Sequence, residues 1–97
     1  MIRVGFSKHG FEMKGHSGYA EAGSDIVCAA VSAMVRLAIN IITEGFNAAH
    51  SLQVSEKEAD LSFEMKEQSE EGSRVLEILK ADLKQLEAEY PKNISIL

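Results

Sequence analysis

The sequence predicts an α+β fold, a compact two-layer domain in which two helices cover one face of a mixed sheet. Short segments with alternating apolar and polar residues, typical of half-buried strands, occur near both ends and in the middle of the chain. Two longer segments carry apolar residues at helical spacing. Their order is ββαββαβ, which favours a single sheet with both helices on the same side.

The first thirteen or so residues predict a β-hairpin. A tight turn is expected at His9-Gly10, and apolar side chains alternate with polar or small ones on both sides of it. The apolar positions are Ile2, Val4 and Phe6 on a first strand over 2–7, and Phe11 and Met13, with Gly15 continuing the alternation, on a second.

A glycine-rich loop and a long apolar helix follow. Residues 15–23 hold three glycines and therefore predict a loop with unusual backbone freedom. Ser24 or Asp25 is expected to cap a helix that runs to about Glu44, with Gly45 as its stop. This helix is apolar around most of its circumference, so we expect it to be the central buried element. Its apolar stretch, 26–42, contains three polar residues and is short for a membrane span, so we expect no membrane partner.

The second half of the chain predicts two strands, a helix and a last strand. The strands cover 48–54 and 58–66 and are joined by a polar turn at 55–57. A charged connector, 68–72, leads to an amphipathic helix over 73–89, which ends before Pro91. Residues 93–97 are expected to form the last short strand. The apolar stripe of the helix is Val75, Leu76, Leu79, Leu83 and Leu86, while Glu77, Lys80, Lys84 and Glu87 are expected to face water.

Length and composition limit the classes of function. Ninety-seven residues predict one domain over 1–97, and a net charge of −5 argues against direct nucleic-acid binding. The acidic surface is compatible with a basic partner or simply with solubility. A single cysteine excludes an internal disulfide. The first residues lack the long apolar run of a signal peptide, so we expect a cytoplasmic protein.

The chemistry of the sequence centres on Cys28 and His16. Cys28 stands about one turn into the first predicted helix, near unpaired N–H groups and the positive end of the helix dipole. His16 lies twelve residues earlier, in the glycine-rich loop. A helix N-terminus and a nearby imidazole both favour the thiolate, the nucleophilic form of cysteine. The alternative is that Cys28 is a small buried apolar residue and His16 an exposed loop residue.

Two further polar residues share a helix face with Cys28. Asp25, Cys28 and Ser32 are spaced i, i+3 and i+7. Asp25 is expected to orient His16, to cap the helix, or to do both. Ser32 is placed to hydrogen-bond the thiol or the loop, or to return its hydroxyl to the Cys28 carbonyl one turn back.

A zinc site is the other chemical option, with His9, His16, Cys28 and His50 as possible ligands. The close ligand pairs typical of structural zinc do not occur in the sequence, so neither a metal nor a cofactor is expected.

The run from Gly15 to Ala33 closely resembles the ribosomal-processing cysteine protease family Prp, and the resemblance extends over the whole chain. The matching segments are Gly15-His16-Ser17-Gly18-Tyr19-Ala20 and Asp25-Ile26-Val27-Cys28-Ala29-Ala30-Val31-Ser32. The resemblance implies that Cys28 is the nucleophile and His16 the catalytic histidine, with Asp25 and Ser32 at motif positions. It also implies a mobile substrate loop, which here contains Gly15, Ser17, Gly18, Tyr19 and Gly23.

The same resemblance implies a substrate and a quaternary state. The family is an endopeptidase that removes a short N-terminal extension from the large-subunit ribosomal protein numbered twenty-seven, cutting after an apolar, phenylalanine-containing segment. It also implies a homodimer. In the expected mechanism, N–H groups near Val27 and Cys28, or in the glycine loop, hold the oxyanion. Two other functions remain open from the residues alone, a non-catalytic ribosome-assembly interaction module and a thiol redox sensor.

Overall fold

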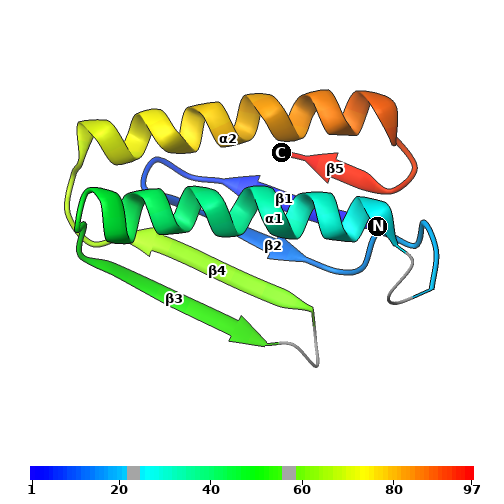
Figure 1. Ribbon diagram of the computed structural model, residues 1–97, viewed down its shortest axis with the longest axis horizontal. Helices are drawn as coiled ribbons and strands as arrows, with labels where there is room; N and C mark the ends of the chain where they lie inside the picture. The colour runs from blue at the N-terminus through cyan, green and yellow to red at the C-terminus, as the bar shows by residue number, and fades with distance from the viewer. Residues whose placement is uncertain (22–24, 56–58) are drawn as a thin grey trace.

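The computed structural model describes residues 1–21, 25–55 and 59–97. The expected turn at 55–57 and the expected positions of Gly23 and Ser24 therefore fall wholly or partly outside the described residues. The element order ββαββαβ is confirmed (Figure 1). The elements are β1 (Ile2–Phe6), β2 (Gly10–Lys14), α1 (Ile26–Asn40), a π-helical turn η1 (Ile41–Gly45), β3 (His50–Ser55), β4 (Asp60–Met65), α2 (Glu70–Glu89) and β5 (Ile94–Ile96).

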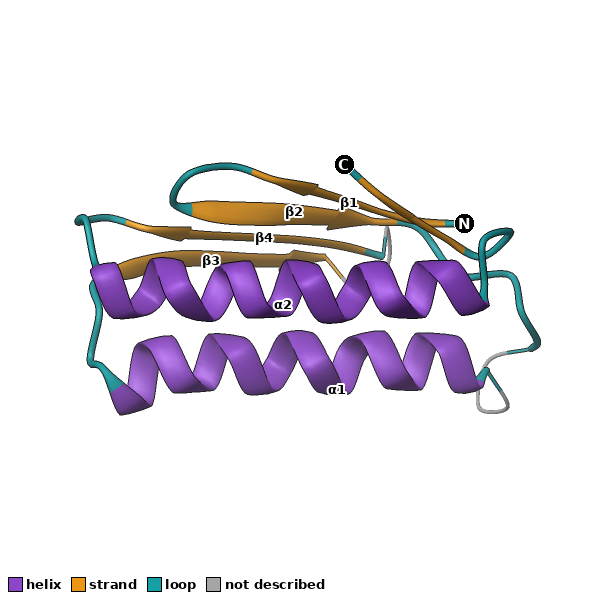
Figure 2. Cartoon of the chain, turned by 90° about the horizontal axis from the view of Figure 1, so that it is seen from above, coloured by secondary structure: helices purple, strands orange, loops and turns teal. Residues whose placement is uncertain are grey.

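The strands form one mixed sheet in the order β3-β4-β2-β1-β5. β1 and β2 pair antiparallel as the expected hairpin, with Val4 opposite Met13. β5 runs parallel to β1, with Ile94 opposite Ile2. Both helices lie on the same face of this sheet, as Figure 2 shows. The predicted two-layer α+β architecture is confirmed, with β3 and β5 at the two edges of the sheet.

The hydrophobic core fills the space between the sheet and the two helices. Alternate residues of β1, β2, β4 and β5 point inward, while intervening residues such as Arg3, Glu12 and Glu64 are exposed. The buried apolar side chains are Ile2, Val4, Phe11, Phe63, Met65, Ile94 and Ile96 from the sheet, Val27, Val31, Val35, Ala38, Ile39 and Ile42 from α1 and η1, and Leu76, Leu79 and Leu83 from α2.

The first helix is less buried than expected. Ile26 and Leu37 are 55% and 62% exposed, because only one side of α1 faces the sheet and α2. The span Ile26–Gly45 has 20 residues and is long and apolar enough to cross a membrane by length and composition, so the expectation that it is too short was wrong. A core helix passes the same test, and here the buried side of α1 is part of the single core.

The second helix begins earlier than predicted. Its first residue is Glu70, because the Ser69 side chain accepts a 3.0 Å hydrogen bond from the Gly72 N–H and caps the helix. Part of the expected connector is therefore helical. Two residues expected to face water are half-buried. The Nζ of Lys80 lies 5.8 Å from the centre of the Phe6 ring, and Oε2 of Glu87 accepts a 2.9 Å hydrogen bond from the Ile96 N–H.

Candidate active site

The segment that carries His16 begins directly after β2. Gly15 has φ +92°, and a Cβ there would lie 2.5 Å from the Met1 carbonyl oxygen, so glycine is the residue that fits. The Gly15 N–H donates a 3.0 Å hydrogen bond to the carbonyl of Ala59. These contacts fix the backbone just before His16, whose own side chain is exposed.

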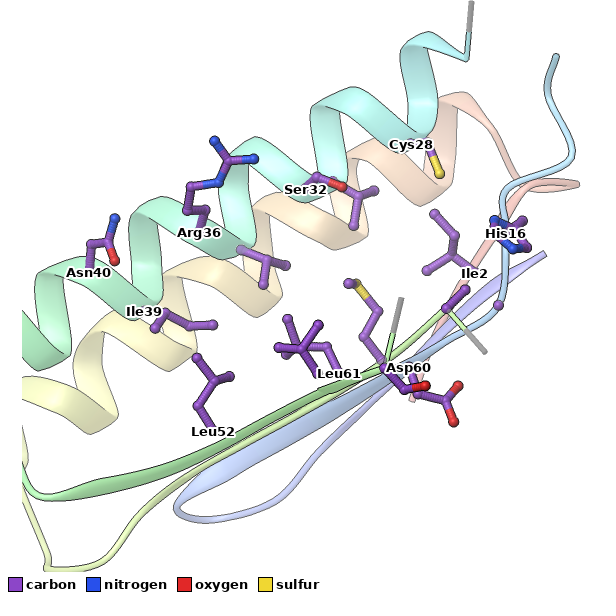
Figure 3. Close-up of a pocket in the computed structure, with 17 residues that line it drawn as sticks. Ile2, His16, Cys28, Ser32, Arg36, Ile39, Asn40, Leu52, Asp60 and Leu61 are labelled. Carbon is purple, nitrogen blue, oxygen red and sulfur yellow. The ribbon is translucent and has the colours of Figure 1, made fainter. Parts of the chain in front are cut away.

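Cys28 is the third residue of α1 and is half-buried. Its sulfur points from the helix into a pocket, and His16 lies across that pocket on the segment after β2 (Figure 3). The two side chains line two adjoining pockets, of about 520 and 570 Å³. The fold therefore brings together a thiol and an imidazole that are twelve residues apart in the sequence.

Asp25 caps α1. Its Oδ1 accepts a 2.9 Å hydrogen bond from the Cys28 N–H, and its Oδ2 accepts one from the Ser17 hydroxyl. The Ser17 bond, followed by the Cys28 bond, lowers the pKa of the Asp25 carboxyl below its ordinary value, because both favour the charged form. Within the described part of the chain, no hydrogen bond joins this carboxylate to His16. The expected orientation of the ring by Asp25 is therefore replaced by a contact to the neighbouring Ser17.

The cap also changes the expectation for the oxyanion. The Cys28 N–H, one of the expected donors, already donates to Asp25 in this structure. Gly18 lines the pocket of about 570 Å³ from the loop side, together with His16, Asp25, Cys28, Ala29 and Ser32. The glycine loop, the other expected source of oxyanion donors, therefore lies beside Cys28 in this pocket.

Ser17, expected as part of the mobile substrate loop, is held in place by hydrogen bonds. It is only 1% exposed, and its hydroxyl accepts a 3.2 Å hydrogen bond from the Tyr19 N–H while it donates to Asp25. Its carbonyl accepts a 3.0 Å hydrogen bond from Nδ2 of Asn93, at the start of the C-terminal segment. Tyr19 is exposed, and its ring packs edge to face on the ring of Tyr90, with 5.6 Å between the ring centres. Sequence reasoning missed Asn93 and Tyr90, since no local pattern links them to the loop.

Ser32 is exposed and lines both pockets, on the same side of α1 as Asp25 and Cys28. This placement follows from the i, i+3, i+7 spacing. The expected hydrogen bond from its hydroxyl to the Cys28 carbonyl is not found among the residues that the structure describes. The hydroxyl is instead presented to the pocket.

The pocket of about 520 Å³ continues from Cys28 as a groove between α1 and the inner faces of β3 and β4 (Figure 3). Ser32, Arg36 and Asn40 follow Cys28 at four-residue intervals along α1. Twelve residues of helix rise about 18 Å, the length of about five extended residues. The groove's other lining is mostly apolar and was not identified from the sequence; it includes Val31, Val35, Ile39, Leu52, Val54 and Leu61.

The other two histidines do not line either of these pockets. His9 is half-buried in the β1–β2 turn, and Nδ1 of His50 lies 2.9 Å from the Ala48 carbonyl oxygen while its ring stacks on Phe63. Over residues 1–21, 25–55 and 59–97, no group of three or more histidine, cysteine or carboxylate side chains is arranged to hold a metal ion.

Relatives of this chain are found among known proteins. Residues 1–95 match the family model described as cysteine protease Prp. The chain is 33% identical over 93 residues to the ribosomal processing cysteine protease Prp of Bacillus subtilis strain 168. The aligned region covers 89% of this chain and 81% of that protein.

Solved structures show the same fold. The protease Prp of S. aureus in complex with a covalently linked product peptide has a TM-score of 0.88 at 22% identity, covering 98% of this chain and 94% of that chain. SMU.848 of Streptococcus mutans has a TM-score of 0.83 at 24% identity, covering 99% and 91%. The two-layer arrangement of the present chain is therefore shared along nearly its whole length.

Proposed function

The chain belongs to the cysteine protease Prp family, and from this premise we propose that it removes a short N-terminal extension from the precursor of large-subunit ribosomal protein twenty-seven. Membership makes the chain a cysteine protease, and its relative in Bacillus subtilis is named for ribosomal processing. The substrate itself is the proposal. The observation that supports it most directly is that His16 and Cys28 line one pocket at the end of an apolar groove.

We propose Cys28 as the nucleophile and His16 as the general base and acid. His16 removes the thiol proton, and the sulfur attacks the carbonyl carbon of the scissile bond. The protonated imidazole then gives its proton to the leaving amine as the C–N bond breaks, which leaves a thioester on Cys28. His16 next deprotonates a water molecule that attacks the thioester carbonyl. The C–S bond then breaks, the acid product leaves, and the Cys28 thiolate takes back the proton from the imidazolium.

The oxyanion of each tetrahedral intermediate needs hydrogen-bond donors. Because the Cys28 N–H donates to Asp25, we propose that backbone N–H groups of the glycine loop, beside Gly18, supply them. One such donor is typically worth about 2.7–4 kcal/mol in the transition state.

The groove suits the apolar segment expected before the cut. Leu52 and Val54 of β3 are 42% and 57% exposed and face α1 across the groove. An extended peptide placed there would cover this apolar surface, which no other part of the described chain buries. The polar side chains of Ser32, Arg36 and Asn40 would line its other side.

We also propose, from the family resemblance, that the protein works as a homodimer in the cytoplasm. Exposed apolar side chains on the helical layer support an association of this kind, because such groups are costly to leave in water when they gather in a patch. They include Leu37, Ile41 and Ile78.

The proposed activity is tested with a synthetic peptide that spans the extension and the first residues of the mature ribosomal protein. The parent protein should cut it once, at the site identified by mass spectrometry of the products. Cys28→Ala and His16→Ala should each lower kcat/KM at least about 1,000-fold. His50→Ala, a histidine outside both pockets, is the matched control and should cut like the parent. Equal cleavage by Cys28→Ala would exclude the mechanism, and no cleavage by the parent would exclude the substrate.

A further inference from the structure

We infer that Asn93 is a positioning residue for the reaction: it holds the segment that carries His16 in register with Cys28, acting through Ser17. The inference rests on the proposed pairing of His16 with Cys28. Its basis is a chain of hydrogen bonds that joins the C-terminal segment, the glycine loop and the start of α1.

Asn93 is itself held on both sides of its backbone. Its N–H donates a 3.0 Å hydrogen bond to the Tyr90 carbonyl, and its carbonyl accepts a 2.9 Å hydrogen bond from the Ile2 N–H. The side chain therefore projects from a fixed point between α2 and β5. From there Nδ2 donates to the Ser17 carbonyl at 3.0 Å, across 76 positions of sequence.

Ser17 passes this constraint to the helix that carries the nucleophile. It is 1% exposed, and its hydroxyl donates to the Asp25 carboxylate, which in turn accepts the Cys28 N–H. The Ser17 carbonyl thus accepts a hydrogen bond from Asn93, and the Ser17 hydroxyl donates one to Asp25, the cap of α1. The loop and the helix are fixed to each other at this point.

His16 lies between two anchors. Its preceding neighbour, Gly15, donates to the Ala59 carbonyl, and its following neighbour, Ser17, accepts from Asn93. Gly15 and Gly18 both have positive φ, at +92° and +71°, so the backbone on either side of His16–Ser17 is of the type that samples many conformations. Without Asn93, Ser17 loses the hydrogen bond on its carbonyl and keeps those of its hydroxyl, with Asp25 and with the Tyr19 N–H.

Asn93 does not line either pocket, so an effect on the reaction would pass through the loop. Displacement of a reacting group by about 1 Å can cost about 100-fold in rate. We therefore expect loss of the Asn93 amide to lower kcat about 10- to 100-fold and to leave KM within about twofold.

The test compares Asn93→Ala and Asn93→Asp with the parent. Aspartate keeps the size of the side chain but loses the N–H donor toward Ser17, so it decides the question if alanine prevents folding. Lys92→Ala, an exposed neighbour in the same segment, is the matched control. Circular dichroism melting confirms that each variant is folded.

Two readouts are taken, peptide cleavage (kcat and KM separately) and alkylation of Cys28 by iodoacetamide. At about pH 6 a thiol without an imidazole partner is almost unreactive, whereas at about pH 10 all thiols react. We expect both Asn93 variants to alkylate at least about fivefold more slowly than the parent at the lower pH and equally fast at the higher one. A purely structural role would lower the melting temperature without this pH-dependent difference. Asn93→Gln, which keeps the amide, should recover part of the kcat.

The outcomes separate this inference from the proposed function. Folded Asn93 variants with the parent's kcat and alkylation profile would overturn the inference and leave the His16–Cys28 pair intact. A His16→Ala variant that alkylates at about pH 6 as fast as the parent would overturn the pair, and the positioning role with it.

Discussion

The backbone N–H of Cys28 donates a 2.9 Å hydrogen bond to Oδ1 of Asp25, while the other oxygen of that carboxylate accepts the hydroxyl of Ser17. One carboxylate therefore caps the helix of the nucleophile and holds the residue that follows His16. Capping and positioning are combined in a single side chain, and this explains why its pKa is lowered by the same two neighbours.

Asp25→Asn should change how stability depends on pH. The pKa of Asp25 is lowered in the folded protein, so its contribution is fully present above the carboxyl's unfolded pKa of about 3.9. It is lost as the pH falls through the lower folded value. The parent should exceed Asp25→Asn in free energy of unfolding at neutral pH, and the difference should shrink below about pH 4. Urea titrations at neutral and acid pH measure this. Asp82→Asn, an exposed carboxylate of α2, is the control, and a difference that stayed constant with pH would contradict the prediction.

Gly15→Ala should destabilise the protein and slow the reaction. Gly15 has a positive φ, and an added Cβ would clash with the Met1 carbonyl. We therefore expect the free energy of unfolding to fall by about 1–3 kcal/mol. Gly18→Ala, with positive φ but open space, should cost about 1–2 kcal/mol. Gly5→Ala, which has open space and no positive φ, is the control. Denaturant unfolding ranks the three, and a Gly15→Ala variant as stable as Gly5→Ala would refute the argument.

Leu83→Ala should lower the free energy of unfolding by about 2–5 kcal/mol, since the Leu83 side chain of α2 is fully buried in the core. Ile78→Ala, an exposed position on the same helix, should cost less than about 1 kcal/mol. Thermal or urea unfolding of the pair measures the difference. Equal losses would mean that α2 does not bury the face described here.

Leu52→Asp should impair recognition of an apolar peptide without unfolding the protein. Leu52 lines the groove and is already 42% exposed, so a carboxylate there stays out of the core but would lose its hydration when an apolar substrate covers it. We expect KM to rise about tenfold, since one lost apolar contact is worth about 1–3 kcal/mol. Gln53→Asp, the next residue of β3 and not part of this groove, is the control. The same KM change in both variants would argue against the groove as the peptide site.

Ser32→Ala tests whether the exposed hydroxyl in the pocket contacts the substrate or activates the thiol. Ser32 lines both pockets and takes no part in the hydrogen bonds that join Ser17, Asp25 and Cys28. We expect kcat/KM to fall less than about tenfold, the size of one neutral hydrogen bond, with Cys28 alkylation unchanged. Slower alkylation of Ser32→Ala would instead assign the hydroxyl to activation of Cys28.

The boundaries that sequence reasoning missed have identifiable physical causes. The charges of Glu70 and Glu71 favour a connector and a helix start at residue 73, whereas the helix begins at Glu70, because acidic residues after a serine cap stabilise a helix N-terminus. The burial of α1 was overestimated, because composition shows how apolar a helix is but not how much of it meets a neighbour. Leu37 is as apolar as Val35 and faces the other way.

By itself the sequence determined the order of the elements, the capping of α1 near Cys28 and the shared face of Asp25, Cys28 and Ser32. These depend on periodicity and on hydrogen bonds within a few residues, which a sequence displays directly. The groove beside Leu52, the burial of Ser17 and its bond to Asn93 were decided only by the tertiary structure. They depend on contacts between segments that are distant in sequence, such as β3 against α1 and the C-terminal segment against the loop after β2, and local patterns carry no record of such contacts.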